Sequence, residues 1–215
     1  MKDIPVFTSE YGAASLVLRE IPYRQRAYIT ILDSLEPAKL LEECVGFCRA
    51  CGAETVFATG ANELQRYPLA SSIVEMWRPK AGLEGTDALL VPITKESVGQ
   101  WRKICNRRMA DVAIAAFFTA QDEKTLLNDA DAYFVEKDGV LVGIGKASGD
   151  TIHAIASLIP GMGETALRAL ATALTGEHIR LTVADSNEKA IGLYTRLGFQ
   201  QTKDLSRWYK VFPQV

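Results

Sequence analysis

The fold of this chain is decided by the stretch Ile179-Arg-Leu-Thr-Val-Ala-Asp-Ser-Asn187-Glu-Lys-Ala-Ile-Gly-Leu-Tyr194-Thr-Arg-Leu-Gly198-Phe199. Its first residues alternate between apolar and polar side chains, which predicts a β-strand. Ser186 or Asn187 can cap the helix that follows, because a short side-chain oxygen accepts a hydrogen bond from an orphan backbone N–H group. Apolar residues then recur at helical spacing, and Gly198 stands where a left-handed residue commonly ends a helix.

This order resembles the second half of the acyl-CoA site of the GNAT-family N-acetyltransferases, in which a strand leads to Asn-x-x-Ala-x-x-Leu-Tyr-x-x-x-Gly-Phe. The resemblance implies that Asn187 contacts the pantetheine arm and that Tyr194 donates a proton to the leaving thiolate. A phenol with a pKa of about 10 is a suitable acid for that step. Taken alone, Asn187 is also typical of a helix cap, and Tyr194 of a core residue on an amphipathic helix.

The same resemblance places the pyrophosphate of acetyl-CoA, the expected cosubstrate, on a turn between a strand and a helix. A helix N-terminus attracts phosphate through its free N–H groups and dipole, and glycine permits a close approach. Gly161 and Gly163 fit the family pattern, whereas Leu158 stands where the family has Arg or Gln, and Glu164 adds negative charge. Gly-x-Gly after a strand is also an ordinary turn. The residues expected to bind the cosubstrate are Leu158, Ile159, Gly161, Met162, Gly163, Glu164, Thr165, Asn187 and Tyr194.

The acceptor amine must lose a proton before it attacks, so a general base is expected. His153, on a predicted strand at 151–158, is the candidate, because its ordinary pKa of about 6.5 suits proton transfer near neutral pH. Glu136 is a weaker candidate, and a lone histidine is more often a surface or core residue. The basic cluster at 105–109 either attracts an acidic acceptor or is a solvated helix surface.

The rest of the chain predicts the class α/β (α+β), with a mixed, mostly antiparallel sheet flanked by helices. Residues 88–215 show the element order of a GNAT domain, and residues 1–85 resemble a degenerate half of the same fold. Pro, Gly and charged residues at 78–87 indicate a linker. We expect strands at 27–32, 55–58, 88–93, 131–136, 140–146, 151–158 and 207–212, and helices at 37–51, 94–106 and 164–174, with a polar helix-like stretch up to residue 77 and a second short helix at 107–111.

Composition is ordinary for a globular protein, with 48% hydrophobic and 23% charged residues among 215. A net charge of −2 gives no general attraction to nucleic acid or to an anionic membrane. Without a long apolar run or a secretory signal, we expect a cytoplasmic protein. Cys44, Cys48 and Cys51 share one helical face, which favours a buried apolar stripe over a metal site.

The sequence therefore predicts an N-acetyltransferase that moves an acetyl group from acetyl-CoA to a primary amine within a ternary complex. The acceptor is a small-molecule amine or a protein amino group. The alternative is a catalytically weak or inactive module that keeps the fold and serves as an acyl-CoA-binding or interaction surface. Residues 1–85 are expected to cover the acceptor cleft, to form a homodimer surface, or only to complete the core.

Overall fold

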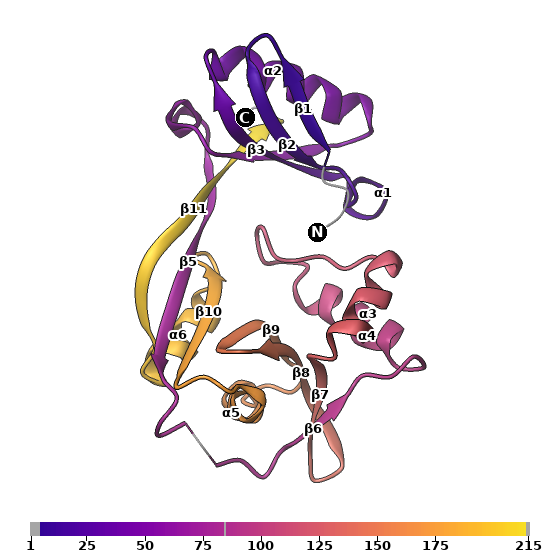
Figure 1. Cartoon of the computed structure of the whole chain (residues 1–215), viewed down its shortest axis with the longest axis vertical. Coiled ribbons are helices and arrows are strands. Elements are labelled where there is room, and N and C mark those ends of the chain that lie inside the picture. The colour runs from indigo at the N-terminus through magenta and orange to yellow at the C-terminus, as the bar shows by residue number, and fades with distance from the viewer. Residues whose placement is uncertain (1–4, 84, 214–215) are drawn as a thin grey trace. The chain divides into compact units, whose positions relative to one another are not determined.

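The computed structural model describes residues 5–83 and 85–213, which form two compact units (Figure 1). The N-terminal unit contains the described residues up to Ile73 together with those from Leu205 onward. The central unit contains Val74–Asp204. These bounds differ from the division at 85–88 drawn from composition, because strands β5 (Leu69–Pro79) and β11 (Gln200–Phe212) each run from one unit into the other.

In the N-terminal unit the strand order is β1-β2-β3-β4-β11. The first three strands form an antiparallel meander, β4 runs parallel to β3, and the end of β11 pairs antiparallel with β4. Helix α2 packs on β2 and β3. The elements are β1 (Val6–Ser9), β2 (Gly12–Val17), α1 (Ile21–Arg24), β3 (Arg26–Ser34), α2 (Pro37–Ala50), β4 (Thr55–Thr59) and the 3-10 helix η1 (Asn62–Arg66).

Helix α2 shows why the sequence forms this layer. Proline occupies its first turn, where no N–H group is needed, and one face carries the apolar residues. Leu40, Leu41, Cys44 and Cys48 from that face are buried in the core of the unit, whereas Cys51 is exposed. The interpretation of the cysteines as a buried stripe is confirmed for Cys44 and Cys48 and is wrong for Cys51.

In the central unit the strand order is β11-β5-β10-β9-β8-β7-β6. Strands β6 to β9 are antiparallel neighbours, and β10 runs parallel to β9. Helix α5 packs on β8 and β9, and α3 contacts β8. The elements are β6 (Leu89–Pro92), α3 (Val98–Arg108), the 3-10 helix η2 (Ala120–Asp122), α4 (Glu123–Asp129), β7 (Ala132–Lys137), β8 (Val140–Ser148), β9 (Thr151–Ser157), α5 (Gly163–Ala173), β10 (His178–Ala184) and α6 (Glu188–Arg196).

A glycine sets how closely α5 approaches the sheet. A Cβ atom on Gly145 of β8 would lie 2.2 Å from Leu170 Cδ1 of α5, so a larger residue there would force Leu170 to move. Leu167 and Leu170 are fully buried as a result. The mixed, mostly antiparallel sheet with helices on it confirms the fold class expected from the sequence.

Two local predictions are wrong, and some elements were not predicted. The helix-like stretch up to Trp77 is η1 followed by strand β5, because pairing with β10 and β11 overrides the helix-forming residues of this segment. The second helix at 107–111 does not form, since α3 continues to Arg108 and ends in a turn. Strands β1 and β2 and helix α4 were not expected at all.

The two units repeat one arrangement. Each has an antiparallel meander of three strands, then a helix, then a strand parallel to the third: β1-β2-β3, α2 and β4 in one, and β7-β8-β9, α5 and β10 in the other. After the parallel strand, the central unit has α6, whereas the N-terminal unit has only η1. The likeness supports the prediction that residues 1–85 are related to half of the fold. Across the described ranges, we find no helix with the length and hydrophobicity needed to cross a membrane.

Candidate active site

Strands β9 and β10 part soon after they meet. Their parallel pairing consists of Thr151 with Arg180 and Ile152 with Leu181. The equivalent strands of the N-terminal unit, β3 and β4, stay paired from Arg26–Thr55 to Thr30–Thr59. The later part of β9 therefore has β8 on one side and an edge free of β10 on the other, which offers strand-like hydrogen bonds to an extended ligand.

A β-bulge marks the point of divergence. Ile152 pairs with Ala147 and Ala154 pairs with Lys146, so that His153 is an extra residue in β9. Bulges bend a strand and leave backbone groups out of the ladder, and they are common beside active sites. The bulge thus turns β9 away from β10 where the paired segment ends.

A cleft of about 280 Å³ lies at this divergence, and we call it the β9–α6 cleft. Its lining comes from β9, from the start of α5 and the N-terminal part of α6, and from the end of α3 and the residues after it. The lining residues are Arg108, Met109, Val112, Ile155, Ala156, Ser157, Gly163, Asn187, Lys189, Ala190, Leu193 and Tyr194. Three residues predicted from two separate motifs, Gly163, Asn187 and Tyr194, are therefore brought to one cleft.

The start of α5 presents free backbone donors. Within the described chain, the N–H groups of Gly163, Glu164 and Thr165 make no backbone hydrogen bond, as is normal for the first turn of a helix. Gly161 has φ of +85°, and a Cβ atom there would meet nothing within 4 Å, so the space beside it is open. Gly163 is tightly placed, because a Cβ atom on it would lie 2.9 Å from Leu193 Cδ2 of α6.

The other residues of the predicted phosphate loop lie outside the cleft lining. Glu164 forms an ion pair with Arg168 at 2.8 Å, which offsets part of its charge at the helix start. Leu158 packs against the apolar cluster that contains α3, and Ile159 and Met162 pack against the cluster beneath α5. No side-chain contact distinguishes Thr165 within the described structure. Leu158 is apolar, so the position at which the family has Arg or Gln offers no charged or polar side chain to a phosphate.

Asn187 occupies the N-cap of α6. Its Oδ1 accepts a hydrogen bond from the Ala190 N–H group at 3.3 Å, so the capping role expected from the sequence is confirmed. The same side chain lines the cleft. Because its oxygen serves the cap, the amide nitrogen is the group available to donate to a carbonyl of a ligand.

Tyr194 is a buried phenol that lines the cleft. It is 6% exposed, and its ring packs beside that of Phe199 with the centroids 5.7 Å apart. Burial raises the pKa of Tyr194 to about 12. None of the described residues forms a hydrogen bond with its hydroxyl group, although the residue lines the cleft. Tyr194 is therefore a protonated, unpaired phenol at neutral pH.

The two base candidates lie apart from this cleft. His153 is exposed on the bulge, and its Nε2 lies 2.9 Å from Ser148 Oγ. Partial burial, together with the positive charge of Lys146, lowers the pKa of His153 below its usual value. Glu136 lies on β7, paired with β6 and β8. Neither residue lines the β9–α6 cleft.

Sequence reasoning missed Lys189 and left Arg108 undecided. Lys189 is in the first turn of α6, and Arg108 is the last residue of α3. Both line the cleft, and neither forms an ion pair within the described ranges. The sequence marked the basic cluster at 105–109 but could not decide its role, because the residues that line the cleft with Arg108 lie about 50 to 85 positions later in the chain.

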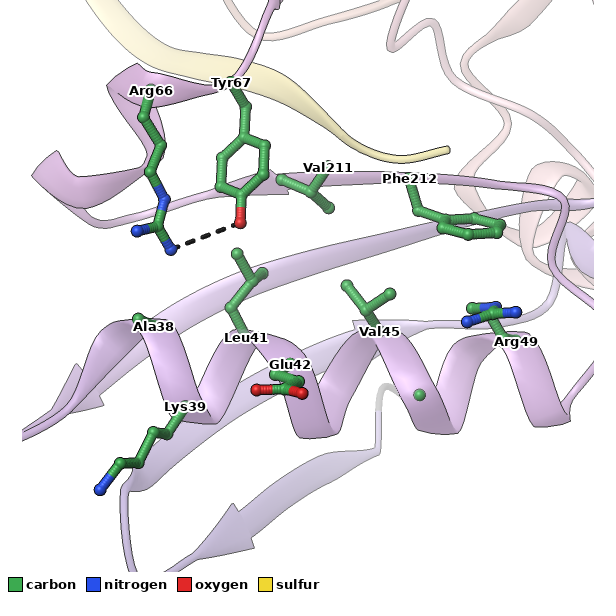
Figure 2. Close-up of a pocket in the computed structure, with 11 residues that line it drawn as sticks. Ala38, Lys39, Leu41, Glu42, Val45, Arg49, Arg66, Tyr67, Val211 and Phe212 are labelled. Atoms are coloured by element: carbon green, nitrogen blue, oxygen red, sulfur yellow. Dashed lines mark hydrogen bonds between the residues drawn. The ribbon is translucent and has the colours of Figure 1, made fainter. Parts of the chain in front are cut away.

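A second groove, of about 840 Å³, lies along α2 in the N-terminal unit (Figure 2). Leu41, Val45 and Val211 form its apolar part. Figure 2 shows Arg66 beside Tyr67 at one end and Arg49 beside Phe212 at the other. It lies where the repeat has η1 in place of a full helix. This groove is larger than the β9–α6 cleft but holds none of the residues that the motifs predict.

No protein-family model and no curated protein matches this chain. Solved structures do. A functionally unknown conserved protein from Staphylococcus epidermidis is 11% identical with a TM-score of 0.60, covering 97% of this chain and 93% of its own. A GCN5-related N-acetyltransferase from Sphaerobacter thermophilus is 11% identical with a TM-score of 0.56, covering 94% and 78%.

A tandem GNAT protein from the clavulanic acid biosynthesis pathway is 12% identical with a TM-score of 0.50, covering 98% of this chain and 83% of its own. At these identities the similarity establishes the fold. The chain has the fold of the GNAT N-acetyltransferases.

Proposed function

We propose that the central unit is an N-acetyltransferase that uses acetyl-CoA to acetylate a primary amine. The observation that supports this most directly is the meeting of Gly163, Asn187 and Tyr194 on one cleft, at the point where β9 and β10 part. Two motifs that are separated in sequence and were chosen for the same cosubstrate thus line one cleft.

Each part of the cleft has a role in this proposal. The free N–H groups at the start of α5 hold the pyrophosphate, and the open space beside Gly161 admits it. The unpaired edge of β9 and the Asn187 amide hold the pantetheine arm. Backbone N–H groups on the edge of β9 that β10 leaves free stabilise the oxyanion that forms when the amine attacks the thioester carbonyl. Bound acetyl-CoA supplies the activated acetyl group.

Tyr194 completes the reaction by protonating the departing thiolate. A phenol is protonated at neutral pH even at its ordinary pKa of about 10, which is the state that an acid needs. Burial raises the pKa of Tyr194 to about 12 and so makes it a weaker acid than an exposed tyrosine. Since neither His153 nor Glu136 lines the cleft, the amine loses its proton to water or enters as the neutral amine. The rate should then rise with pH through the pKa of the acceptor amine.

A second candidate function is a module of this fold that binds acyl-CoA weakly and does not turn over. The absence of a cation at Leu158 and of a base in the cleft lining favours it. Titration of acetyl-CoA into the protein by calorimetry separates the two. Micromolar binding, followed by thiol release with an amine, supports the enzyme. No binding up to millimolar concentration contradicts it.

A further inference from the structure

The charges that line the β9–α6 cleft are all positive. Arg108 and Lys189 are its charged lining residues, and no aspartate or glutamate is among the described residues that line it. An unpaired cation at the edge of a partly enclosed cleft raises the local concentration of anions and disfavours a second cation. Polyamines and lysine side chains usually need carboxylates around them, and this lining offers none.

The two cations come from different helices. Lys189 is two residues after the cap residue Asn187, in the first turn of α6. The proposed phosphate site, the start of α5, lines the same cleft through Gly163. Arg108 is at the end of α3, and Met109 and Val112 from the residues that follow line the cleft with it.

We propose that the acceptor is a primary amine that also carries a carboxylate, and that Arg108 binds that carboxylate; this inference rests on the proposed acetyltransferase function. A guanidinium group presents paired N–H donors that match the two oxygens of a carboxylate. With the carboxylate at Arg108 of α3 and the thioester near Tyr194 of α6, the amine of an amino acid-like molecule lies between them in the cleft that both residues line. Arg108 thus selects and positions the acceptor.

Arg107 provides a matched control. It precedes Arg108 in the last turn of α3, is also exposed, and forms no ion pair within the described ranges, but it does not line the cleft. Removing either arginine takes one positive charge from the same helix end, so both changes should alter helix stability alike. Only the loss of Arg108 should affect the acceptor.

The test measures thiol release with acetyl-CoA and a panel of amino acids, each paired with its α-carboxamide, and with spermidine. We expect kcat/KM to be at least about tenfold higher for the acids than for their amides, as is usual for a charge-assisted hydrogen bond. Arg108→Ala should raise KM for the acids by about tenfold or more and leave the amides unchanged. Arg107→Ala should change neither, and acetyl-CoA affinity, measured by calorimetry, should be the same in all three proteins.

Equal use of acids and amides, a preference for spermidine, or acetylation of no panel member by a protein that binds acetyl-CoA would overturn the inference. So would a loss of acetyl-CoA affinity in Arg108→Ala, because the arginine would then hold phosphate. Failure of the proposed function is distinguished by the calorimetry, since it appears as absent acetyl-CoA binding in the unaltered protein. In that case, binding of the N-acetylated amino acids to the protein alone, and its loss in Arg108→Ala, still decides whether Arg108 holds a carboxylate.

Discussion

Tyr194 combines deep burial with a hydroxyl group that no described residue bonds. Replacement of Tyr194 by Phe keeps the ring and its packing against Phe199, so stability should change by less than about 1 kcal/mol. If the phenol is the acid, kcat should fall by about 100-fold or more. Steady-state kinetics gives the rate, and calorimetry with CoA should show unchanged affinity. A variant that retains the full rate would remove Tyr194 from the chemistry.

Single residues differ in how well the sequence predicted them. Asn187 and Tyr194 could be assigned, because a helix places residues seven positions apart on one face, so their spacing survives folding. The role of Arg108 could not be decided from the sequence, because its relation to the cleft depends on how α3 packs against the sheet. The bulge at His153 could not be predicted either, since it arises from the pairing of β9 with β8 rather than from local residue preferences.

At the scale of elements, the turn before α5 decides whether phosphate can approach. Gly161→Leu would place a side chain in the open space beside the free N–H groups. Gly139→Leu is the matched control, because Gly139 also has positive φ and open space around it but lies in the β7–β8 turn. Both variants should lose similar stability from the strained backbone, about 1–2 kcal/mol.

Only Gly161→Leu should weaken acetyl-CoA binding, by roughly tenfold or more, which corresponds to about 1.4 kcal/mol. Calorimetric titration of the two variants and the unaltered protein measures this. Equal affinity in all three would show that the pyrophosphate does not lie on this turn.

Elements were predicted best where local pattern and final pairing agree. The strands and helices from β6 onward have clear periods and glycine turns, and most of their bounds agree with the structure. Strand β5 is the opposite case. Its Val74 and Met76 are buried on one face of the sheet, but the preceding polar residues of η1 favour a helix. Partners more than 100 residues away decide its structure, and no local pattern contains them.

At the scale of the whole molecule, buried thiol and phenol groups determine how the free energy of unfolding changes at high pH. Burial raises the pKa of five side chains: Cys44 to about 11, and Tyr28, Cys48, Cys105 and Tyr194 to about 12. Between the unfolded and folded pKa values, the folded protein holds more protons than the unfolded chain, so stability falls as pH rises. The contribution is complete below about pH 8 and is lost progressively toward pH 12.

Urea unfolding at pH 8, 9.5 and 11 should therefore give midpoints that decrease steadily. Each unit of pKa shift corresponds to about 1.4 kcal/mol, so the total loss should reach several kcal/mol. Tyr194→Phe should reduce the loss that occurs above pH 10. A midpoint that stays constant from pH 8 to 11 would contradict the burial of these groups.

The passage of β5 and β11 between the units has a consequence for a cleaved chain. Gly85 and Asp87 are exposed, and exposed segments with glycine are common sites of proteolytic nicking. A cut there leaves one fragment with β1 to β5 and another with β6 to β11. Strands β4 and β5 of the first fragment remain hydrogen-bonded to β11 and β10 of the second. A nicked sample should show two bands on a denaturing gel but elute as one species in native buffer, held together as a complex of two polypeptides with no covalent link.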